Sequence, residues 1–171
     1  MCLRSLIFNC VFYGVTAGLV VLALPAMLLP EAVIQAVARF WGLLTVWLLR
    51  IVGATHRVSC ELHHGRQVIY AAKHQSAWET IVLSLLLRTP VVVLKRELLK
   101  LPLLGWYFKK AGCIAVDRAA GMRALRQLRD DAAAARDAGR SLLIFPQGTR
   151  VAPGAQHKYE IGVFALYEAT D

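Results

Sequence analysis

The stretch Val68-Ile-Tyr-Ala-Ala-Lys-His-Gln-Ser-Ala-Trp-Glu-Thr80 decides the fold of this 171-residue chain. Its first five residues, Val68–Ala72, have the length and the apolar, partly β-branched composition of a buried strand. Just downstream, Ser76 and Glu79 have the Ser-x-x-Glu spacing of a capping box, which places Ser76 at the N-cap of a helix and Glu79 at its third position. His74 then lies in the loop between a strand and a helix.

Short apolar runs and longer segments of helical period alternate over the rest of the chain. Strands are expected at Val58–Leu62, Val68–Ala72, Val91–Leu94, Cys113–Val116 and Leu142–Phe145, and helices at Ala77–Leu87, Leu98–Lys110 and Met122–Ala138. The last helix is expected to stop at Gly139. Such alternation is typical of βαβ units, so we expect an α/β fold with a mostly parallel sheet and flanking helices.

Polar and basic residues directly follow four of the expected strands. They are His74, Lys95 with Arg96, Asp117 with Arg118, and the segment Pro146–Arg150. Ligands of open parallel sheets bind beyond the carboxyl ends of the strands. We therefore expect a binding site at that edge of the sheet.

The N-terminal third of the chain is strongly apolar. Residues 5–30 carry no charge, and residues 32–55 carry only Arg39 and Arg50. Two apolar segments, about 5–29 and 32–54, flank a turn at Pro30-Glu31, and each is long enough to cross a bilayer. A secretory signal would have a shorter apolar stretch and a small-residue cleavage site. The sequence thus predicts a membrane-associated helical hairpin over 1–55, followed by an α/β domain over 56–171.

Positive charge lies at both ends of this hairpin, with Arg4 before it and Arg50, His56 and Arg57 at its far end. By the positive-inside rule both ends face the cytoplasm, so the protein is expected at the cytoplasmic face of a membrane. In a bacterium this would be the inner membrane. Whether the hairpin spans the bilayer or dips into one leaflet stays open.

The net charge of +9 is compatible with binding to a nucleic acid, or to an anionic membrane and a phosphorylated substrate. The apolar hairpin favours the membrane, and no nucleic-acid partner is expected.

The four cysteines Cys2, Cys10, Cys60 and Cys113 have no paired spacing, so neither a disulfide set nor a metal site is expected.

His74 and Glu79 are a candidate catalytic pair. Five residues apart on one helix, they would be about 140° apart around the axis, so they can meet only if His74 precedes the helix. A carboxylate in that place can orient an imidazole, which can then accept a proton from a hydroxyl. From the spacing alone, a plain capping role for Glu79 is the favoured alternative.

The segment Phe145-Pro-Gln-Gly-Thr-Arg150 reads as a turn after a buried strand. Pro146 and Gly148 shape the turn, Thr149 offers a hydroxyl, and Arg150 offers a guanidinium suited to phosphate. A strand-ending turn with a solvated arginine is the simpler alternative.

The strings His74–Thr80 and Phe145–Arg150 resemble two signature blocks of the glycerolipid acyltransferases, the family of 1-acyl-sn-glycerol-3-phosphate (lysophosphatidic acid) acyltransferase. In that family the blocks read His-x-x-x-x-Asp and Phe-Pro-Glu-Gly-Thr-Arg. This chain departs from them with Glu79 for the Asp and Gln147 for the Glu. The stretch Lys95–Trp106, followed by Gly112–Arg118, is similar to the family's second block. The segment Lys158–Leu166 is similar to the part that follows the third block, and the resemblance covers roughly residues 67–169.

The resemblance implies acyl transfer to the free hydroxyl of lysophosphatidic acid, giving phosphatidic acid. His74 would be the general base and Glu79 its orienting carboxylate. Arg118, Gly148, Thr149 and Arg150 would hold the acceptor phosphate, with Lys95 a weaker candidate. The implied partners are a lysophospholipid acceptor, an acyl-CoA or acyl-carrier-protein donor, and the bilayer, with no cofactor beyond the donor and no metal.

Two alternatives remain open at this point. The acceptor could be another lysolipid, such as an ornithine lipid, because arginine–phosphate contacts say nothing about the rest of the headgroup. The chain could also be a catalytically decayed lipid-binding protein. Gln147 favours decay, and so does the end of the chain at Asp171, where the family continues with a further strand carrying a fourth block. On this ground the domain is expected to be truncated at its C-terminus.

Overall fold

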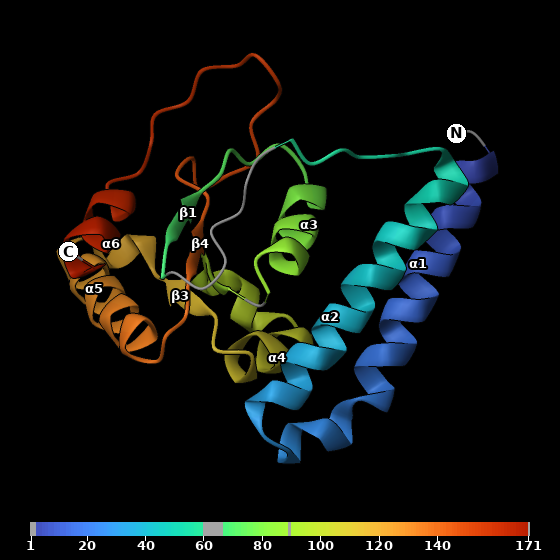
Figure 1. Ribbon diagram of the computed structural model, residues 1–171, viewed down its shortest axis with the longest axis horizontal. Helices are drawn as coiled ribbons and strands as arrows, with labels where there is room; N and C mark the ends of the chain where they lie inside the picture. Colours follow the sequence, from blue (N-terminus) through green and yellow to red (C-terminus); the bar gives the residue numbers. More distant parts are fainter. Residues whose placement is uncertain (1–2, 60–66, 89, 171) are drawn as a thin grey trace. The chain divides into compact units, whose positions relative to one another are not determined.

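The computed structural model describes residues 3–59, 67–88 and 90–170 (Figure 1). The chain forms two compact units, Met1–Leu62 and His63–Asp171. The division after residue 55 that the sequence suggests stays a prediction.

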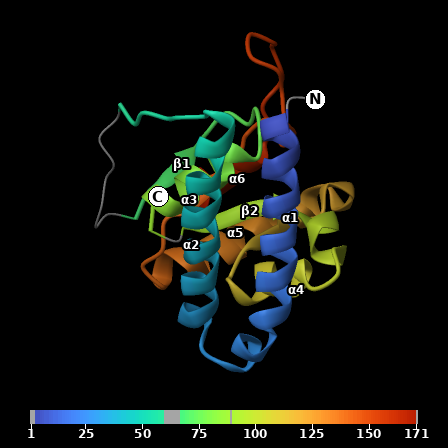
Figure 2. The same ribbon diagram turned by 90° about the vertical axis from the view of Figure 1, so that its right-hand side faces the viewer.

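The first unit is a pair of apolar helices. Helix α1 spans Leu3–Leu22 and α2 spans Glu31–Leu48, with short 3₁₀ turns η1 at Leu24–Leu28 and η2 at Leu49–Val52. Figure 2 shows α1 and α2 side by side, and the indole N–H of Trp41 donates to the Thr16 hydroxyl at 3.0 Å. The expected hairpin is confirmed.

A proline divides the first of the two expected apolar segments. Pro25 lies in the first turn of η1, where its missing N–H and its ring prevent α1 from continuing. Pro30 then precedes α2 in an extended conformation, which sets the start of the second helix. The segment expected over 5–29 is therefore one long helix followed by a separate 3₁₀ turn.

The second unit is built on a parallel sheet of four strands. They are β1 (Ile69–Ala71), β2 (Val91–Lys95), β3 (Ile114–Val116) and β4 (Leu142–Ile144), in the spatial order β1-β4-β2-β3. Every pairing is parallel, and Tyr70 of β1 lies opposite Leu143 of β4. The expected α/β fold with its parallel sheet is confirmed. The strand expected at Val58–Leu62 is wrong at Val58 and Ser59, which lie in no strand, and its remainder lies outside the described residues.

Helices connect and cover these strands. Helix α3 (Trp78–Leu86) follows β1, η3 (Arg96–Lys100) and α4 (Leu104–Lys110) follow β2, and η4 (Arg118–Ala120) and α5 (Met122–Asp137) follow β3. Helix α6 (Gly162–Thr170) comes after β4 and packs beside α5 (Figure 1). Leu128 and Ala132 of α5, Leu142 of β4 and Leu166 of α6 are almost fully buried in one core cluster. This core holds the strands whose carboxyl ends carry the site.

The end of α5 follows its sequence signal. Gly139 has a φ of +73°, its N–H donates to the Arg136 carbonyl, and the N–H of Arg140 donates to the Ala135 carbonyl. This pair of bonds is a Schellman motif, which needs a residue that tolerates a left-handed conformation. The predicted stop at Gly139 is confirmed.

The helix expected over Leu98–Lys110 is wrong as a single element. Leu103 has a φ of +62° and a ψ of −53°, and the N–H of Leu104 donates to the Pro102 carbonyl at 2.6 Å. This γ-turn separates η3 from α4. Pro102 cannot donate a backbone hydrogen bond and disfavours a helical conformation at Leu101, so the amphipathic period continues across a break in the backbone.

Candidate active site

His74 and Glu79 meet at the start of α3. The Nδ1 atom of His74 lies 2.7 Å from Oε1 of Glu79, and their side chains are 21% and 14% exposed. The contact is possible because α3 begins at Trp78, which leaves His74 in the preceding loop. The catalytic roles of both residues stay predictions.

Glu79 also binds the backbone before this helix, whose N-cap is Ala77 and not the predicted Ser76, so Glu79 is the second helical residue and not the third. Its Oε1 accepts the N–H groups of Gln75 at 2.7 Å and Ser76 at 2.8 Å, while its Oε2 accepts the Ser76 hydroxyl at 2.6 Å. The Ser76 oxygen in turn accepts the N–H of Trp78 at 3.0 Å. One carboxylate thus makes the bond to the Ser76 N–H that a capping box predicts and also contacts the imidazole, so the two interpretations of the sequence are compatible.

The charge state of Glu79 fixes the tautomer of His74. Burial raises the pKa of Glu79, but the hydrogen bonds from Ser76, from its own backbone N–H and from His74 outweigh this and lower the pKa from 4.5 to about 2. An ionised carboxylate only accepts hydrogen bonds, so Nδ1 of His74 carries the ring proton. The other nitrogen, Nε2, is then left with a lone pair that can take a proton from a hydroxyl. The Phe145 ring lies 4.4 Å from the imidazole, centroid to centroid, and covers one side of it.

Gln147 joins the second sequence motif to the first. Because β4 lies beside β1, the loop after β4 meets the loop that holds His74. The backbone N–H of His74 donates to Oε1 of Gln147 at 2.7 Å, and the His74 carbonyl accepts the N–H of Val151 at 2.8 Å. Gln147 is only 5% exposed. Sequence reasoning treated this residue as a weakened position and missed its contact with the histidine loop.

Arg118 and Gly148 meet at the neighbouring part of the same edge. Nη2 of Arg118 donates to the Gly148 carbonyl at 2.8 Å, and Nη1 lies 3.3 Å from Oε1 of Glu160. Gly148 has a φ of +63°, and a Cβ at this position would overlap the Arg118 guanidinium. The arginine can therefore lie across the turn only because residue 148 is glycine. Glu160 has no signal in the sequence that would have pointed to it.

The remaining predicted phosphate ligands are less closely held. Thr149 and Arg150 are exposed in the turn that follows Gly148, and Lys95 is exposed at the end of β2. Within the part of the chain that the structure describes, neither the Arg150 nor the Lys95 side chain forms a hydrogen bond or ion pair. Arg96, beside Lys95, is paired with Asp117 at 2.6 Å.

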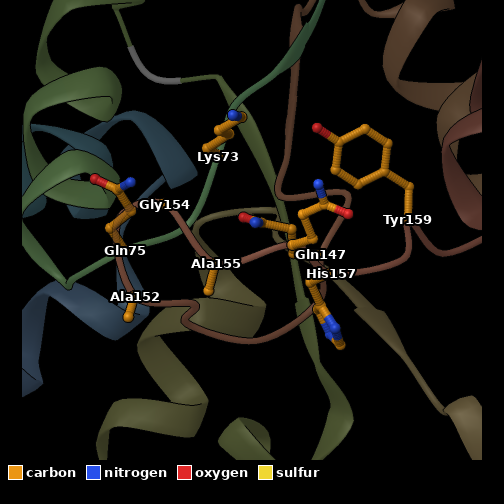
Figure 3. A pocket seen from close by; sticks show the side chains of 9 residues that line it. Lys73, Gln75, Gln147, Ala152, Gly154, Ala155, His157 and Tyr159 are labelled. Atoms are coloured by element: carbon orange, nitrogen blue, oxygen red, sulfur yellow. The ribbon is translucent and has the colours of Figure 1, made fainter.

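A polar pocket of about 340 Å³ opens beside the histidine loop (Figure 3). Its lining comprises Lys73, Gln75, Gln147, Ala152, Gly154, Ala155, Gln156, His157 and Tyr159. Lys73 and Gln75 are the sequence neighbours of His74, so the pocket lies next to the proposed base. Over residues 3–59, 67–88 and 90–170, no group of three or more His, Cys, Asp or Glu residues is arranged to hold a metal ion.

Comparison with known proteins supports the resemblance of the two motifs. The family model described as Acyltransferase matches residues 54–171. A 1-acyl-sn-glycerol-3-phosphate acyltransferase of Pseudomonas aeruginosa is 37% identical over 132 residues, which cover 76% of this chain and 51% of the relative. A protein of the same name from Limnanthes douglasii is 27% identical over 126 residues, covering 73% of this chain and 44% of the relative.

The chain thus spans about half the length of the curated relatives it matches. No solved structure gives a significant match. The family model covers well over half of the chain and includes both motif loops and all four strands, and on this ground the chain belongs to the acyltransferase family.

Proposed function

We propose that this protein transfers an acyl group from a thioester donor to the free glycerol hydroxyl of lysophosphatidic acid. The observation that carries the proposal is the 2.7 Å contact between His74 and Glu79, which leaves Nε2 of the imidazole as the free base. The two named relatives are 1-acyl-sn-glycerol-3-phosphate acyltransferases, which supports this choice of acceptor.

In the proposed reaction, Nε2 of His74 takes the proton of the glycerol hydroxyl as its oxygen attacks the thioester carbonyl carbon. The new C–O bond forms, the C–S bond breaks, and the thiolate leaves with the proton that His74 returns. The ionised Glu79 stabilises the imidazolium between these two steps. Direct attack needs no nucleophile from the enzyme and no cofactor besides the acyl-CoA or acyl-carrier-protein donor. The product is phosphatidic acid, a phospholipid precursor.

The acceptor phosphate is assigned to the edge where Arg118 crosses Gly148. Two arginines, Arg118 and Arg150, come from the ends of β3 and β4, and a guanidinium can hold phosphate oxygens with two parallel hydrogen bonds. Thr149 adds a hydroxyl in the same turn, and Lys95 adds a more distant positive charge at the end of β2. This assignment favours a phosphorylated acceptor over an ornithine lipid, which carries no phosphate.

The decayed-enzyme alternative loses its main support at Gln147. Oε1 of Gln147 accepts the His74 N–H, and a neutral amide oxygen can make this bond, as a carboxylate oxygen can. The replacement of the family's Glu by Gln therefore leaves the histidine loop supported.

We also propose that helices α1 and α2 hold the protein at the cytoplasmic face of a membrane. Two apolar stretches, Leu3–Leu22 and Glu31–Val52, have the length and hydropathy of membrane spans, and α1 has no buried residue. Large apolar side chains stand exposed along both helices, among them Leu6, Tyr13, Leu22, Phe40 and Trp47. Fractionation of cells tests this proposal, because the protein should stay with membranes after a carbonate wash. Release by that wash would contradict it.

An acylation assay on the purified protein tests the reaction. Lysophosphatidic acid is supplied with labelled acyl-CoA or acyl-carrier protein, and an ornithine lysolipid serves as a second acceptor. The His74→Ala variant should lose about 10²- to 10⁴-fold in rate, the usual contribution of a general base. His56→Ala is the matched control, because His56 belongs to the first unit and to neither motif, and it should leave the rate unchanged. Near wild-type turnover by folded His74→Ala protein would overturn the mechanism.

A further inference from the structure

We propose that the pocket beside His74 binds the 4′-phosphopantetheine arm of the acyl donor. This inference rests on the proposed function and assigns the side of the site that receives the thioester. Three parts of the chain line the pocket, namely Lys73 and Gln75 around His74, Gln147 after β4, and the loop from Ala152 to Tyr159. Figure 3 shows Gln75 and Tyr159 on opposite sides of the pocket, with Gln147 between them.

The chemistry of this lining matches the arm. The lining includes three glutamines, Gln75, Gln147 and Gln156, together with Tyr159. A carboxamide both donates and accepts hydrogen bonds, so it can pair with an amide on either side. The pantetheine arm carries two amides and one hydroxyl, and it is the same in coenzyme A and in acyl-carrier protein.

Gln147 gives the pocket an oriented donor. The residue is 5% exposed, and its Oε1 accepts from the backbone N–H of His74. Its Nε2 therefore keeps its two hydrogens, and it makes no hydrogen bond to any other residue that the structure describes. Among the described residues no buried side-chain nitrogen or oxygen lacks a partner, so this donor is open to the pocket that Gln147 lines and is available to a ligand. An amide carbonyl of the arm would accept from it.

The charges of the lining suit the phosphate end of the arm. Lys73 contributes an ammonium group, and no Asp or Glu belongs to the lining. The small side chains of Ala152 and Ala155 leave room between the polar groups. Because large aliphatic side chains are missing from the lining, the pocket suits the polar arm better than the acyl chain. Its volume of about 340 Å³ lies in the range of small-molecule sites, which is enough for an extended arm.

The pocket is separate from the groups assigned to the acceptor phosphate. Neither Arg118 nor Arg150 lines it, whereas both sequence neighbours of His74 do. An arm that fills the pocket would end next to the histidine loop, where its sulfur carries the acyl group to be transferred. The donor would thus enter beside Gln75 and the acceptor beside Gly148.

The test uses the full chain in detergent and the double variant Gln75→Leu/Gln156→Leu. These changes remove two carboxamides without touching the bond between Gln147 and His74. The KM for the donor should rise on the order of 10-fold, since each lost hydrogen bond costs about 2- to 10-fold in affinity. The KM for lysophosphatidic acid should change less than about twofold. Gln127→Leu, which removes an exposed carboxamide from α5, is the matched control and should alter neither.

Two comparisons decide the outcome: the donor KM with acyl-CoA against that with acyl-carrier protein, and the change in donor KM against the change in acceptor KM. The rise should be the same with acyl-CoA and with acyl-carrier protein, because the arm is what they share. A rise with acyl-CoA alone, or a rise in the acceptor KM in place of the donor KM, would overturn the assignment.

Binding of free 4′-phosphopantetheine, followed by ligand-observed NMR, separates this inference from the proposed function. Wild-type protein should bind the arm and the double variant should bind it at least several-fold more weakly. If wild type transfers acyl groups but both proteins bind the arm alike, the pocket assignment fails and the function stands. If wild type shows no transfer, the function fails, and the difference in arm binding alone decides the pocket.

Discussion

The backbone N–H of His74 donates to Oε1 of Gln147 at 2.7 Å, a bond between residues 73 positions apart. It fixes the loop after β1 to the loop after β4, while the His74 side chain is held separately by Glu79. Backbone and ring of the proposed base are thus oriented by two different motifs. The relationship gives residue 147 a positioning role that needs an acceptor oxygen and no charge.

Replacement of Gln147 tests this role. Gln147→Glu keeps an acceptor for the His74 N–H and should retain most of the activity. Gln147→Leu leaves that N–H without its partner, which should cost about 1–3 kcal/mol of unfolding free energy and lower kcat. Thermal or denaturant unfolding and steady-state kinetics measure the two effects. Equal behaviour of the Leu variant and wild type would show that the bond is incidental.

Glu79 should influence both stability and rate. Its pKa in the folded protein, about 2, lies below the ordinary value of 4.5, so the ionised form stabilises the fold. That contribution is complete above pH 4.5 and is lost as the pH falls towards 2. The unfolding free energy of wild type relative to Glu79→Gln should therefore be highest above pH 4.5 and shrink below it.

Activity separates the two roles of the same residue. Glu79→Gln can still close the capping box but cannot stabilise an imidazolium, whereas Glu79→Asp keeps the charge. We expect the Gln variant to lose on the order of 10²-fold in kcat and the Asp variant to keep substantial activity. A Gln variant with full activity would leave Glu79 with a capping role only.

Gly148→Ala should weaken binding of the acceptor. The added Cβ would overlap the Arg118 guanidinium and displace it from the turn. The acceptor KM should rise about 10-fold, the effect of losing one charge-assisted contact. Gly139→Ala is the control, because Gly139 also has a positive φ but meets no atom closer than 3.8 Å. A loss that is equal in both variants would point to backbone strain and not to Arg118.

The two arginines should act on the acceptor and not on the donor. Arg118→Ala and Arg150→Ala should each raise the acceptor KM by about 10-fold or more, and lysine should rescue poorly because it cannot form two parallel bonds. Arg129→Ala, which removes an exposed charge from α5, should leave the acceptor KM unchanged. Unaltered acceptor kinetics in both site variants would remove the phosphate assignment.

Glu160 should oppose the acceptor. Its carboxylate lies 3.3 Å from Nη1 of Arg118, and the two side chains are 53% and 41% exposed, so an incoming phosphate can displace it. Glu160→Gln should lower the acceptor KM by about two- to fivefold at low salt, and by less at high salt, as expected for an exposed pair. Glu168→Gln on α6 is the control for charge. A higher KM in Glu160→Gln would mean that Glu160 orients Arg118.

Local chemistry explains which parts of this fold the sequence predicts. The Ser-x-x-Glu string placed the start of α3 to within one residue, and Gly139 placed the end of α5, because both signals act over a few residues. The helix over Leu98–Lys110 failed because a γ-turn at Leu103 interrupts the backbone without interrupting the amphipathic pattern. A periodicity cannot report a single residue with positive φ.

The contacts that complete the site lie beyond such local signals. Glu160 and Arg118 are 42 residues apart, and only the folded position of the loop after β4 brings them together. The same loop supplies most of the pocket lining, from Ala152 to Tyr159, and its sequence carries no periodic pattern. The sequence predicts a site at the ends of the strands, but which side chains touch there depends on the spatial order of the strands.

That spatial order also has a consequence for how the protein folds during synthesis. Strand β4 lies between β1 and β2, and within the described sheet β1 has no other neighbour. Until residues 142–144 leave the ribosome, β1 lacks its only partner and β2 shows an open edge. The loop that carries His74 is translated early, but its backbone is fixed only after β4 has been made. Such long-range pairing makes for slow folding, and a chaperone that shields β1 and β2 during this interval would raise the yield of folded protein.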